Sequence, residues 1–197
     1  MEGRIFRLSQ LSEATSLQTR YNSMLSGNAS YNPSSFDSIA TANGTGSSGT
    51  ITFSSIPSTY THLQVRFMAL TSVSPVDVMM KINSTVTGLY DHYVMGYGTG
   101  VNATNDTPAA NGLYLTPQGV KSTNPTVGVI DFLDYTNTNK YKTVRNLDGR
   151  DENGAGFVAL NSYLFNTTSA ISSITFTTAS GNFTTDTKFA LYGIKGA

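Results

Sequence analysis

The chain has 197 residues, a length that fits one domain of ordinary size with a hydrophobic core that needs no metal or disulfide. Its 12 basic and 12 acidic residues give a formal net charge of zero. A neutral chain lacks the positive surface that attracts phosphate backbones and anionic lipids. The composition therefore disfavours nucleic acid as a partner, and it suits a protein that packs against copies or neighbours in an assembly.

The chain contains no cysteine, which excludes disulfides, thiolate metal sites and cysteine nucleophiles. Charged residues interrupt the first twenty positions, and no segment approaches the roughly 18 consecutive apolar residues of a membrane-spanning helix. The sequence therefore predicts neither a signal peptide nor a membrane span.

Residues 1–33 are predicted to form a helical N-terminal arm. Ser9 or Ser12 would cap the start of the helix, and Gly27 lies where it would stop. A helix of about 12–18 residues is marginal in isolation, so we expect it to pack on its own domain or on another subunit, and the sequence leaves both open. The candidate docking residues recur at the spacings of one helix face: Leu8, Leu11, Tyr21 and Leu25.

From residue 34 to residue 197 the apolar spacing changes to two, which predicts a single all-β domain, an antiparallel β-sandwich or jelly-roll-like fold. Residues 36–42 and 51–53 are predicted to pair as a hairpin around the glycine-rich turn 43–49. Residues 141–145 and 156–160 are predicted to form a second hairpin around the polar turn 147–154.

Further strands are indicated by alternation or by continuous apolar character. Residues 63–69 and 78–82 alternate as strands buried on one face. Residues 127–135 are apolar on both faces and predict a central strand. The remaining predicted segments are a strand around Ile174 and Phe176, a closing strand containing Phe189, Leu191 and Ile194, and a surface loop from Gly98 to Gly112.

The residues that carry chemistry do not form a recognisable catalytic or metal motif. His62 and His92 are the only histidines, and they lack the HExxH spacing of zinc enzymes. No Gly-x-Ser-x-Gly elbow marks a serine nucleophile. Asp131 and Asp134 are predicted to lie on opposite faces of one strand, where they cannot act as an acid and base pair. We therefore expect no enzyme activity, catalytic residue, cofactor or metal site.

Three acidic residues near a glycine have two competing interpretations. Asp148, Asp151 and Glu152 resemble hard oxygen ligands in a turn, but their spacing does not fit a calcium loop and Arg150 lies among them. A solvated hairpin tip is the favoured interpretation, and cation binding stays an open alternative.

The region from Tyr90 to Tyr114 is the candidate recognition region, because tyrosine, asparagine and glycine together suit binding surfaces. Packing of the same tyrosines in the core is an equal alternative. The candidate recognition residues on the predicted loop and its flanks are Tyr97, Asn102, Asn105, Asp106 and Tyr114.

Two blocks of sequence resemble virion structural proteins of tailed bacteriophages, particularly marine phages and cyanophages. Residues 52–63 contain the segment Ile56-Pro57-Ser58-Thr59-Tyr60, and residues 168–195 end in Phe189-Ala190-Leu191-Tyr192-Gly193-Ile194-Lys195. The resemblance frames most of residues 36–197 and implies a β-sandwich on the virion with no catalytic residues to transfer. The family often has a tryptophan after the second hairpin, where this chain has Leu164 and Phe165.

The resemblance implies a non-enzymatic virion protein that assembles in the host cytoplasm with other tail or capsid proteins. The leading hypothesis is a surface appendage, a tail-fibre or host-attachment component docked by its N-terminal arm, with a host glycan or protein as receptor. The alternative is a capsid decoration protein that stabilises the head. A homo-oligomer, with a trimer favoured, is expected from particle architecture alone. A polysaccharide depolymerase is disfavoured because no acid pair is evident.

Overall fold

The computed structural model describes residues 36–85, 89–97, 100–106 and 112–195. The predicted arm, including Leu8, Leu11, Tyr21 and Leu25, lies outside the described residues. The described part contains twelve strands: β1 (Phe36–Asn43), β2 (Thr50–Phe53), β3 (His62–Ala69), β4 (Val78–Ile82), β5 (Leu89–Tyr97), β6 (Gly100–Asp106), β7 (Leu113–Tyr114), β8 (Thr126–Phe132), β9 (Lys142–Asp151), β10 (Gly156–Phe165), β11 (Ile174–Thr178) and β12 (Lys188–Ile194).

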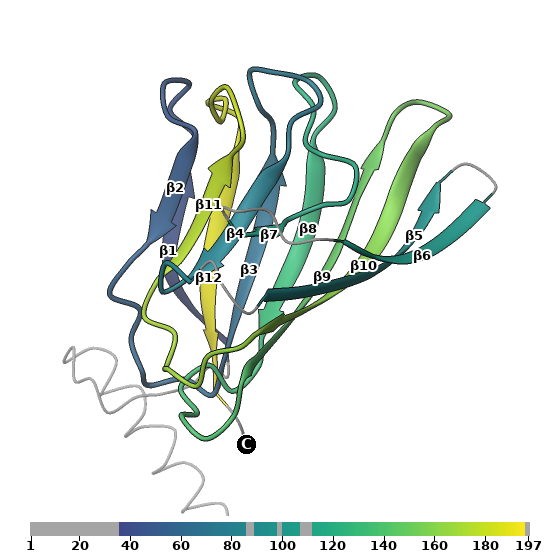
Figure 1. Cartoon of the computed structure of the whole chain (residues 1–197). Coiled ribbons are helices and arrows are strands. Elements are labelled where there is room, and N and C mark those ends of the chain that lie inside the picture. The colour runs from purple at the N-terminus through teal and green to yellow at the C-terminus, as the bar shows by residue number, and fades with distance from the viewer. Residues whose placement is uncertain (1–35, 86–88, 98–99, 107–111, 196–197) are drawn as a thin grey trace, which may run out of the picture. The chain divides into compact units, whose positions relative to one another are not determined.

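The strands form two antiparallel sheets that pack as a β-sandwich, as predicted. The eight-stranded sheet has the order β1-β12-β3-β8-β9-β10-β5-β6, and the four-stranded sheet has the order β2-β11-β4-β7. Figure 1 shows the smaller sheet in front of one part of the larger sheet, with β5 and β6 extending beyond it. We call the face of the eight-stranded sheet on the side of the core its inner face, and the opposite face its outer face.

Alternating side chains of both sheets form the core. On β3, Leu63, Val65 and Phe67 point inward and are buried, which confirms the predicted alternation. The two sheets meet in aromatic contacts, since the ring of Phe176 on β11 stacks on Phe189 of β12 with 4.4 Å between centroids. Leu191 is fully buried beside them, so the predicted closing strand is confirmed.

The predicted hairpin of residues 36–42 and 51–53 is wrong, because its strands belong to different sheets. β1 pairs with β12, whereas β2 pairs with β11. The connection between β1 and β2 lies beside the connection between β11 and β12. The Gly44 amide of the first donates to Thr187 O of the second at 2.9 Å. A Cβ on Gly44 would lie 2.0 Å from Thr184 O, so glycine is required for this close approach. The glycine-rich segment is thus a corner between sheets.

The second predicted hairpin is confirmed, but its strands are longer than expected. β9 and β10 pair over their full lengths, so the turn is confined to residues 152–155, and residues 147–151 are strand. β8 is the predicted central strand, with β3 and β9 as its neighbours. It ends at Phe132, so Asp134 lies outside it, in a turn with φ of 46°.

The predicted loop from Gly98 to Gly112 is wrong over residues 100–106, which form the edge strand β6 paired with β5. The sequence lacked a signal because Val101, Asn102, Ala103 and Thr104 are all exposed, so neither face of β6 requires apolar residues. β5 was not predicted as a strand either. Both strands extend the eight-stranded sheet past the edge of the smaller one (Figure 1).

Candidate functional site

The candidate recognition residues are distributed over three strands. The backbone of Tyr97 lies at the end of β5, while Asn102, Asn105 and Asp106 lie on the edge strand β6. Tyr114 lies on β7, in the other sheet, where it is half-buried and pairs with Met79. The structure therefore places the asparagines on a sheet edge, apart from Tyr114.

The tyrosines of β5 point to different sides of the sheet. Tyr90 is on the outer face and is 52% exposed. Tyr93 is half-buried on the inner face, where it packs against a small cluster formed by Met95, Phe157 and Ala159. Alternation along the strand thus separates the two rings, so they do not form one continuous stacking surface.

Asp148 does not lie at a solvated hairpin tip, contrary to the favoured sequence interpretation. It is on β9, points inward and is only 3% exposed. Asp151 is the exposed last residue of the same strand, while Glu152 begins the turn. A strand forms here because every second residue, Asn146, Asp148 and Arg150, finds polar partners in the interior.

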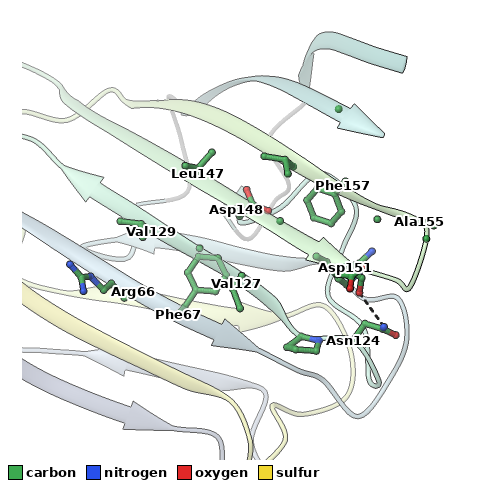
Figure 2. Close-up of a pocket in the computed structure, with 18 residues that line it drawn as sticks. Arg66, Phe67, Asn124, Val127, Val129, Leu147, Asp148, Asp151, Ala155 and Phe157 are labelled. Carbon is green, nitrogen blue, oxygen red and sulfur yellow. Dashed lines mark hydrogen bonds between the residues drawn. The ribbon is translucent and has the colours of Figure 1, made fainter. Parts of the chain in front are cut away.

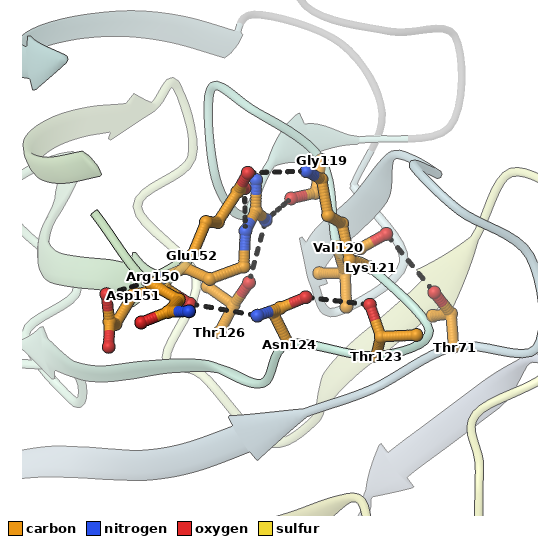
Figure 3. Close-up of polar contacts among 11 residues, drawn as sticks. Thr71, Gly119, Val120, Lys121, Thr123, Asn124, Thr126, Arg150, Asp151 and Glu152 are labelled. Atoms are coloured by element: carbon orange, nitrogen blue, oxygen red, sulfur yellow. Dashed lines mark hydrogen bonds and ion pairs between the residues drawn. The ribbon is translucent and has the colours of Figure 1, made fainter. Parts of the chain in front are cut away.

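The Arg150 side chain connects several segments at one end of the eight-stranded sheet (Figure 3). Its guanidinium donates to Gly119 O at 2.7 Å and to Thr126 Oγ1 at 3.2 Å. It also pairs with Glu152 at 2.7 Å, and Glu152 pairs with Lys121 at 2.7 Å. These contacts lower the pKa of Glu152, with the Lys121 hydrogen bond as the largest cause. Both Glu152 oxygens are used to tie two segments of the protein together, which is a structural role.

A buried polar network lies behind β9 and β10. Asn146 Nδ2 and Asn161 Nδ2 both donate to Asp148 Oδ1, at 2.9 Å and 2.7 Å. Asn146 Nδ2 also donates to Leu115 O at 2.7 Å, and the Tyr163 hydroxyl donates to Tyr114 O at 3.0 Å. The network thus links the eight-stranded sheet to the segment around β7.

Burial perturbs the two acidic groups of this network. Loss of solvation raises the pKa of Asp148 to about 7, although its hydrogen bonds and the Arg150 charge oppose the shift. Burial also raises the pKa of Tyr163 well above its ordinary value, helped by the negative charges of Asp91 and Asp148. Perturbed groups often mark active sites, but Asp148 and Tyr163 are only 3% and 1% exposed.

The outer face of the same strands is apolar and open. A groove of about 1260 Å³ runs over β8, β9 and β10, and Figure 2 shows Val127, Val129 and Leu147 among its lining residues. Leu147 and Leu160 are each 54% exposed, and Val158 is 63% exposed. Soluble monomers seldom expose large contiguous apolar patches, so such a surface indicates an interaction site.

The strand register arranges these side chains in two parallel rows. The residues in each row are direct cross-strand neighbours over β8, β9, β10, β5 and β6. The first row is Val129, Leu147, Leu160, Val94 and Ala103, and the second row is Val127, Gly149, Val158, Gly96 and Val101. We call these ten residues the outer apolar patch.

The histidines have separate positions with no shared ligand geometry. His62 lies on β3, where its Nδ1 accepts a hydrogen bond from the Asp134 amide at 2.9 Å. His92 is on the outer face of β5, and three strands of the sheet separate it from β3. In the described part of the chain, no three histidine, aspartate or glutamate side chains come close enough to hold a metal ion.

The chain matches no protein-family model, and it has no significant similarity to a curated protein or a solved structure. No helix among the described residues is long and apolar enough to cross a membrane. The function therefore has to be inferred from the residues and the fold.

The outer apolar patch and the buried network are two features of the structure that the sequence did not predict. The signal was present in β9, where Asn146, Asp148 and Arg150 share one face and Leu147 lies on the other. The Asp-Gly-Arg-Asp segment is typical of a turn, so the sequence predicts a loop here and the reversed alternation is concealed.

Proposed function

We propose that this protein is a non-enzymatic structural component of a tailed-bacteriophage virion, a tail-fibre or host-attachment appendage docked by its N-terminal arm. The observation that carries the structural role is the outer apolar patch, which suits contact with another protein surface. Of the acidic residues around it, Asp148 is buried, Glu152 is ion-paired and Asp151 is exposed at the border of the patch. These features support assembly over catalysis.

The virion assignment rests on the two sequence blocks, and their contact in the fold supports treating them as one unit. Tyr60, from the Ile-Pro-x-x-Tyr block, covers Gly193 of the C-terminal block, where an added Cβ would lie 2.4 Å from the Tyr60 ring. The Thr61 amide donates to Ile194 O at 2.8 Å, and Lys195 Nζ lies 5.6 Å from the centroid of the Tyr60 ring. The packing of the Tyr60 ring on Gly193 thus explains why one block contains a tyrosine and the other a glycine at these positions.

Capsid decoration is the second candidate, and the outer apolar patch favours it. A decoration protein contacts a broad capsid surface, and the outer face of five strands offers an extended contact of that kind. Both candidates use the protein as a building block of the particle and differ in where it is placed.

Immunogold electron microscopy tests the proposal, with antibodies raised against the purified chain and applied to purified phage particles. Label on the tail or its fibres supports the appendage, whereas label distributed over the head supports decoration. Particles without label, from a lysate in which the protein is present, would contradict both.

The role of the arm is tested by deletion of residues 1–28. Because the described strands begin at Phe36, we expect the shortened chain to keep the far-ultraviolet circular dichroism of an all-β protein and to lose incorporation into particles. Normal incorporation of this variant would contradict arm docking.

The recognition role of the β5–β6 region is tested on side chains, since deletion would remove a strand. Asn102→Ala on the exposed edge strand should reduce adsorption to host cells while particle assembly is unchanged. Thr52→Ala, on the exposed face of the smaller sheet, is the matched control. Equal adsorption by the two variants would argue against recognition through Asn102.

A further inference from the structure

In the outer apolar patch, the outward-facing residues of β9 follow an order that suits contact with a second, antiparallel copy of the same strand. The last four outward-facing residues of this strand, after Thr143, are Arg145, Leu147, Gly149 and Asp151. Asp148 lies midway among these four residues, with the large apolar side chain of Leu147 on one side of it and Gly149, which has no side chain, on the other. The next outward residue is a cation on the Leu147 side and an anion on the Gly149 side.

This order is complementary to its own reverse. If a second copy lies face to face with its β9 antiparallel, Leu147 of one copy lies over Gly149 of the other. The same rotation brings the exposed Arg145 of one copy opposite the exposed Asp151 of the other. A two-fold axis repeats both contacts, which is the defining property of an isologous interface.

We propose that two copies of this chain associate through the outer apolar patch, about a two-fold axis in the plane of the interface near Asp148 of β9. The association does not depend on where the protein resides in a particle. Sheets that pack face to face keep their strands within about 30° of each other, so the antiparallel alignment holds best at β9 and its neighbours.

The neighbouring strands supply the rest of the contact. On β5, Val94 precedes Gly96, whose outer side is open because a Cβ there would meet nothing within 4 Å. β10 carries Val158 and Leu160 between these two strands, and both are more than half exposed. The patch therefore offers apolar side chains together with one open glycine position, Gly96, into which such a side chain of the partner fits.

The size of the patch indicates an association of moderate strength. Five strands about 4.8 Å apart and two rows of residues cover roughly 300 Å² in projection. Stable interfaces bury about 800 Å² on each partner, so the patch would form an apolar centre, and Arg145 and Asp151 would belong to a polar rim around it. We expect a dimer that dissociates on dilution.

A second copy is favoured over another occupant because Arg145 and Asp151 of β9, at opposite borders of the patch, carry opposite charges and would face each other in such a pair. The formal net charge of zero also means that no long-range repulsion opposes association of identical chains. Coverage of the patch by residues 1–35 of the same chain is the main alternative, and the experiment distinguishes it.

The first test compares two substitutions on the same strand and face of the full-length chain. Leu147→Lys puts a charge at the centre of the interface, while Thr143→Lys puts the same charge four residues away, about 13 Å along the strand. Sedimentation equilibrium from about 1 to 100 µM covers the range expected of a small interface. We expect the dimer dissociation constant to rise about tenfold or more for Leu147→Lys and to stay within about twofold for Thr143→Lys.

The second test uses charge exchange, which identifies partners across the axis. Arg145→Glu and Asp151→Lys should each weaken the dimer, because each places like charges opposite each other. An equimolar mixture of the two variants should restore association, since the glutamate introduced in one chain then faces the lysine introduced in the other, and the unchanged Asp151 and Arg145 also pair. Within one chain these positions are about 20 Å apart, so rescue by mixing cannot arise inside a monomer.

Four results would overturn the proposal. The first is a full-length chain that stays monomeric at about 100 µM, the upper end of the concentration range above, and the second is a trimer or another non-dimeric state. The third is an equal effect of Leu147→Lys and Thr143→Lys on association. The fourth is a mixture of Arg145→Glu and Asp151→Lys that does not associate better than either variant alone. A monomer whose thermal midpoint falls on Leu147→Lys but not on Thr143→Lys would show instead that residues 1–35 cover the patch.

Discussion

Two regions of the eight-stranded sheet use their faces in opposite ways. On β3 and β12 the inner face is apolar, with Leu63, Val65 and Leu191 fully buried, and the outer face carries polar and charged residues such as Gln64 and Arg66. On β9 and β10 the inner face holds a buried polar network and the outer face carries exposed leucine and valine. The two regions adjoin at β8.

The difference teaches that one sheet can serve two purposes. The β3 and β12 region faces the smaller sheet and obtains its stability from apolar burial, with Phe189 of β12 stacked on Phe176. The β9 and β10 region satisfies its interior with hydrogen bonds and leaves apolar area on the outside. Exposed apolar area does not stabilise a monomer, so this region is better suited to an interface.

The largest effect is expected at the apolar end of the comparison. Leu191→Ala removes a fully buried side chain from the centre of the core and should cost about 2–5 kcal/mol of unfolding free energy. Equilibrium urea denaturation measures the loss. A cost below about 0.5 kcal/mol, the size typical of surface positions, would mean that Leu191 is not in the core.

The buried polar network should make the stability depend on pH. Burial raises the pKa of Asp148 to about 7, whereas an unfolded aspartate titrates near 3.9. Between these values the folded state retains a proton that the unfolded state has lost. The stabilising contribution of this group is therefore complete below about pH 4 and declines as the pH rises to about 7.

Asp148→Asn should remove this dependence, because an amide keeps an oxygen acceptor for Asn146 and Asn161 without a charge. The difference in unfolding free energy, Asp148→Asn minus the natural chain, should therefore be about 2–3 kcal/mol larger at pH 8 than at pH 5. Urea denaturation of both proteins at each pH gives the difference. Asp151→Asn, at an exposed position of the same strand, is the control, and parallel pH profiles for Asp148→Asn and the natural chain would contradict the buried charge.

The apolar region was predictable from sequence, and the polar region was not. Alternation over residues 63–69 is a local signal, since each inward residue is apolar and most outward residues are polar or charged. At Asp148 the inward residue is polar because Asn161 of the neighbouring strand and a loop carbonyl supply hydrogen bonds to the network. These partners are distant in sequence, so no local pattern distinguishes a buried aspartate from a turn aspartate.

The same argument applies to sheet membership. Residues 36–42 and 51–53 were predicted to pair because a glycine-rich segment joins them, yet each pairs with a strand from the C-terminal part of the chain. A glycine-rich connection serves equally well as a hairpin turn and as a corner between sheets. Whether the segment is a turn or a corner depends on which distant strands pair with its neighbours, and the local sequence does not indicate that pairing.

Gly128 marks the boundary between the two regions, and a methyl group there should be costly. It lies on the inner face of β8, between Phe67 of β3 and Asp148 of β9. An added Cβ would lie 2.6 Å from the Phe67 ring and 2.9 Å from Asp148 Cβ. Gly128→Ala should therefore destabilise the protein by about 1–3 kcal/mol through overpacking.

Gly96→Ala is the matched control for this substitution, because a Cβ at Gly96 meets nothing within 4 Å. Urea denaturation should show a cost for Gly128→Ala and almost none for Gly96→Ala. Equal stabilities of the two variants would mean that Phe67 moves freely, and that the two regions are not tightly packed against each other at β8.

The smallest effect is expected at the outer apolar patch of a dilute monomer. Leu160 is 54% exposed, so Leu160→Thr should change the unfolding free energy by less than about 0.5 kcal/mol when the chain is too dilute to associate. Leu63→Thr, on the inner face of the same sheet, should cost more than about 2 kcal/mol because Leu63 is fully buried.

Repeating the Leu160→Thr measurement at high concentration sharpens the comparison. A partner that binds only the folded chain adds to its stability by mass action, so the natural chain should gain stability on concentration and the variant should gain less. A large cost for Leu160→Thr that is the same at both concentrations would mean that the outer face is already covered within the monomer, and the contrast between the two regions would then fail.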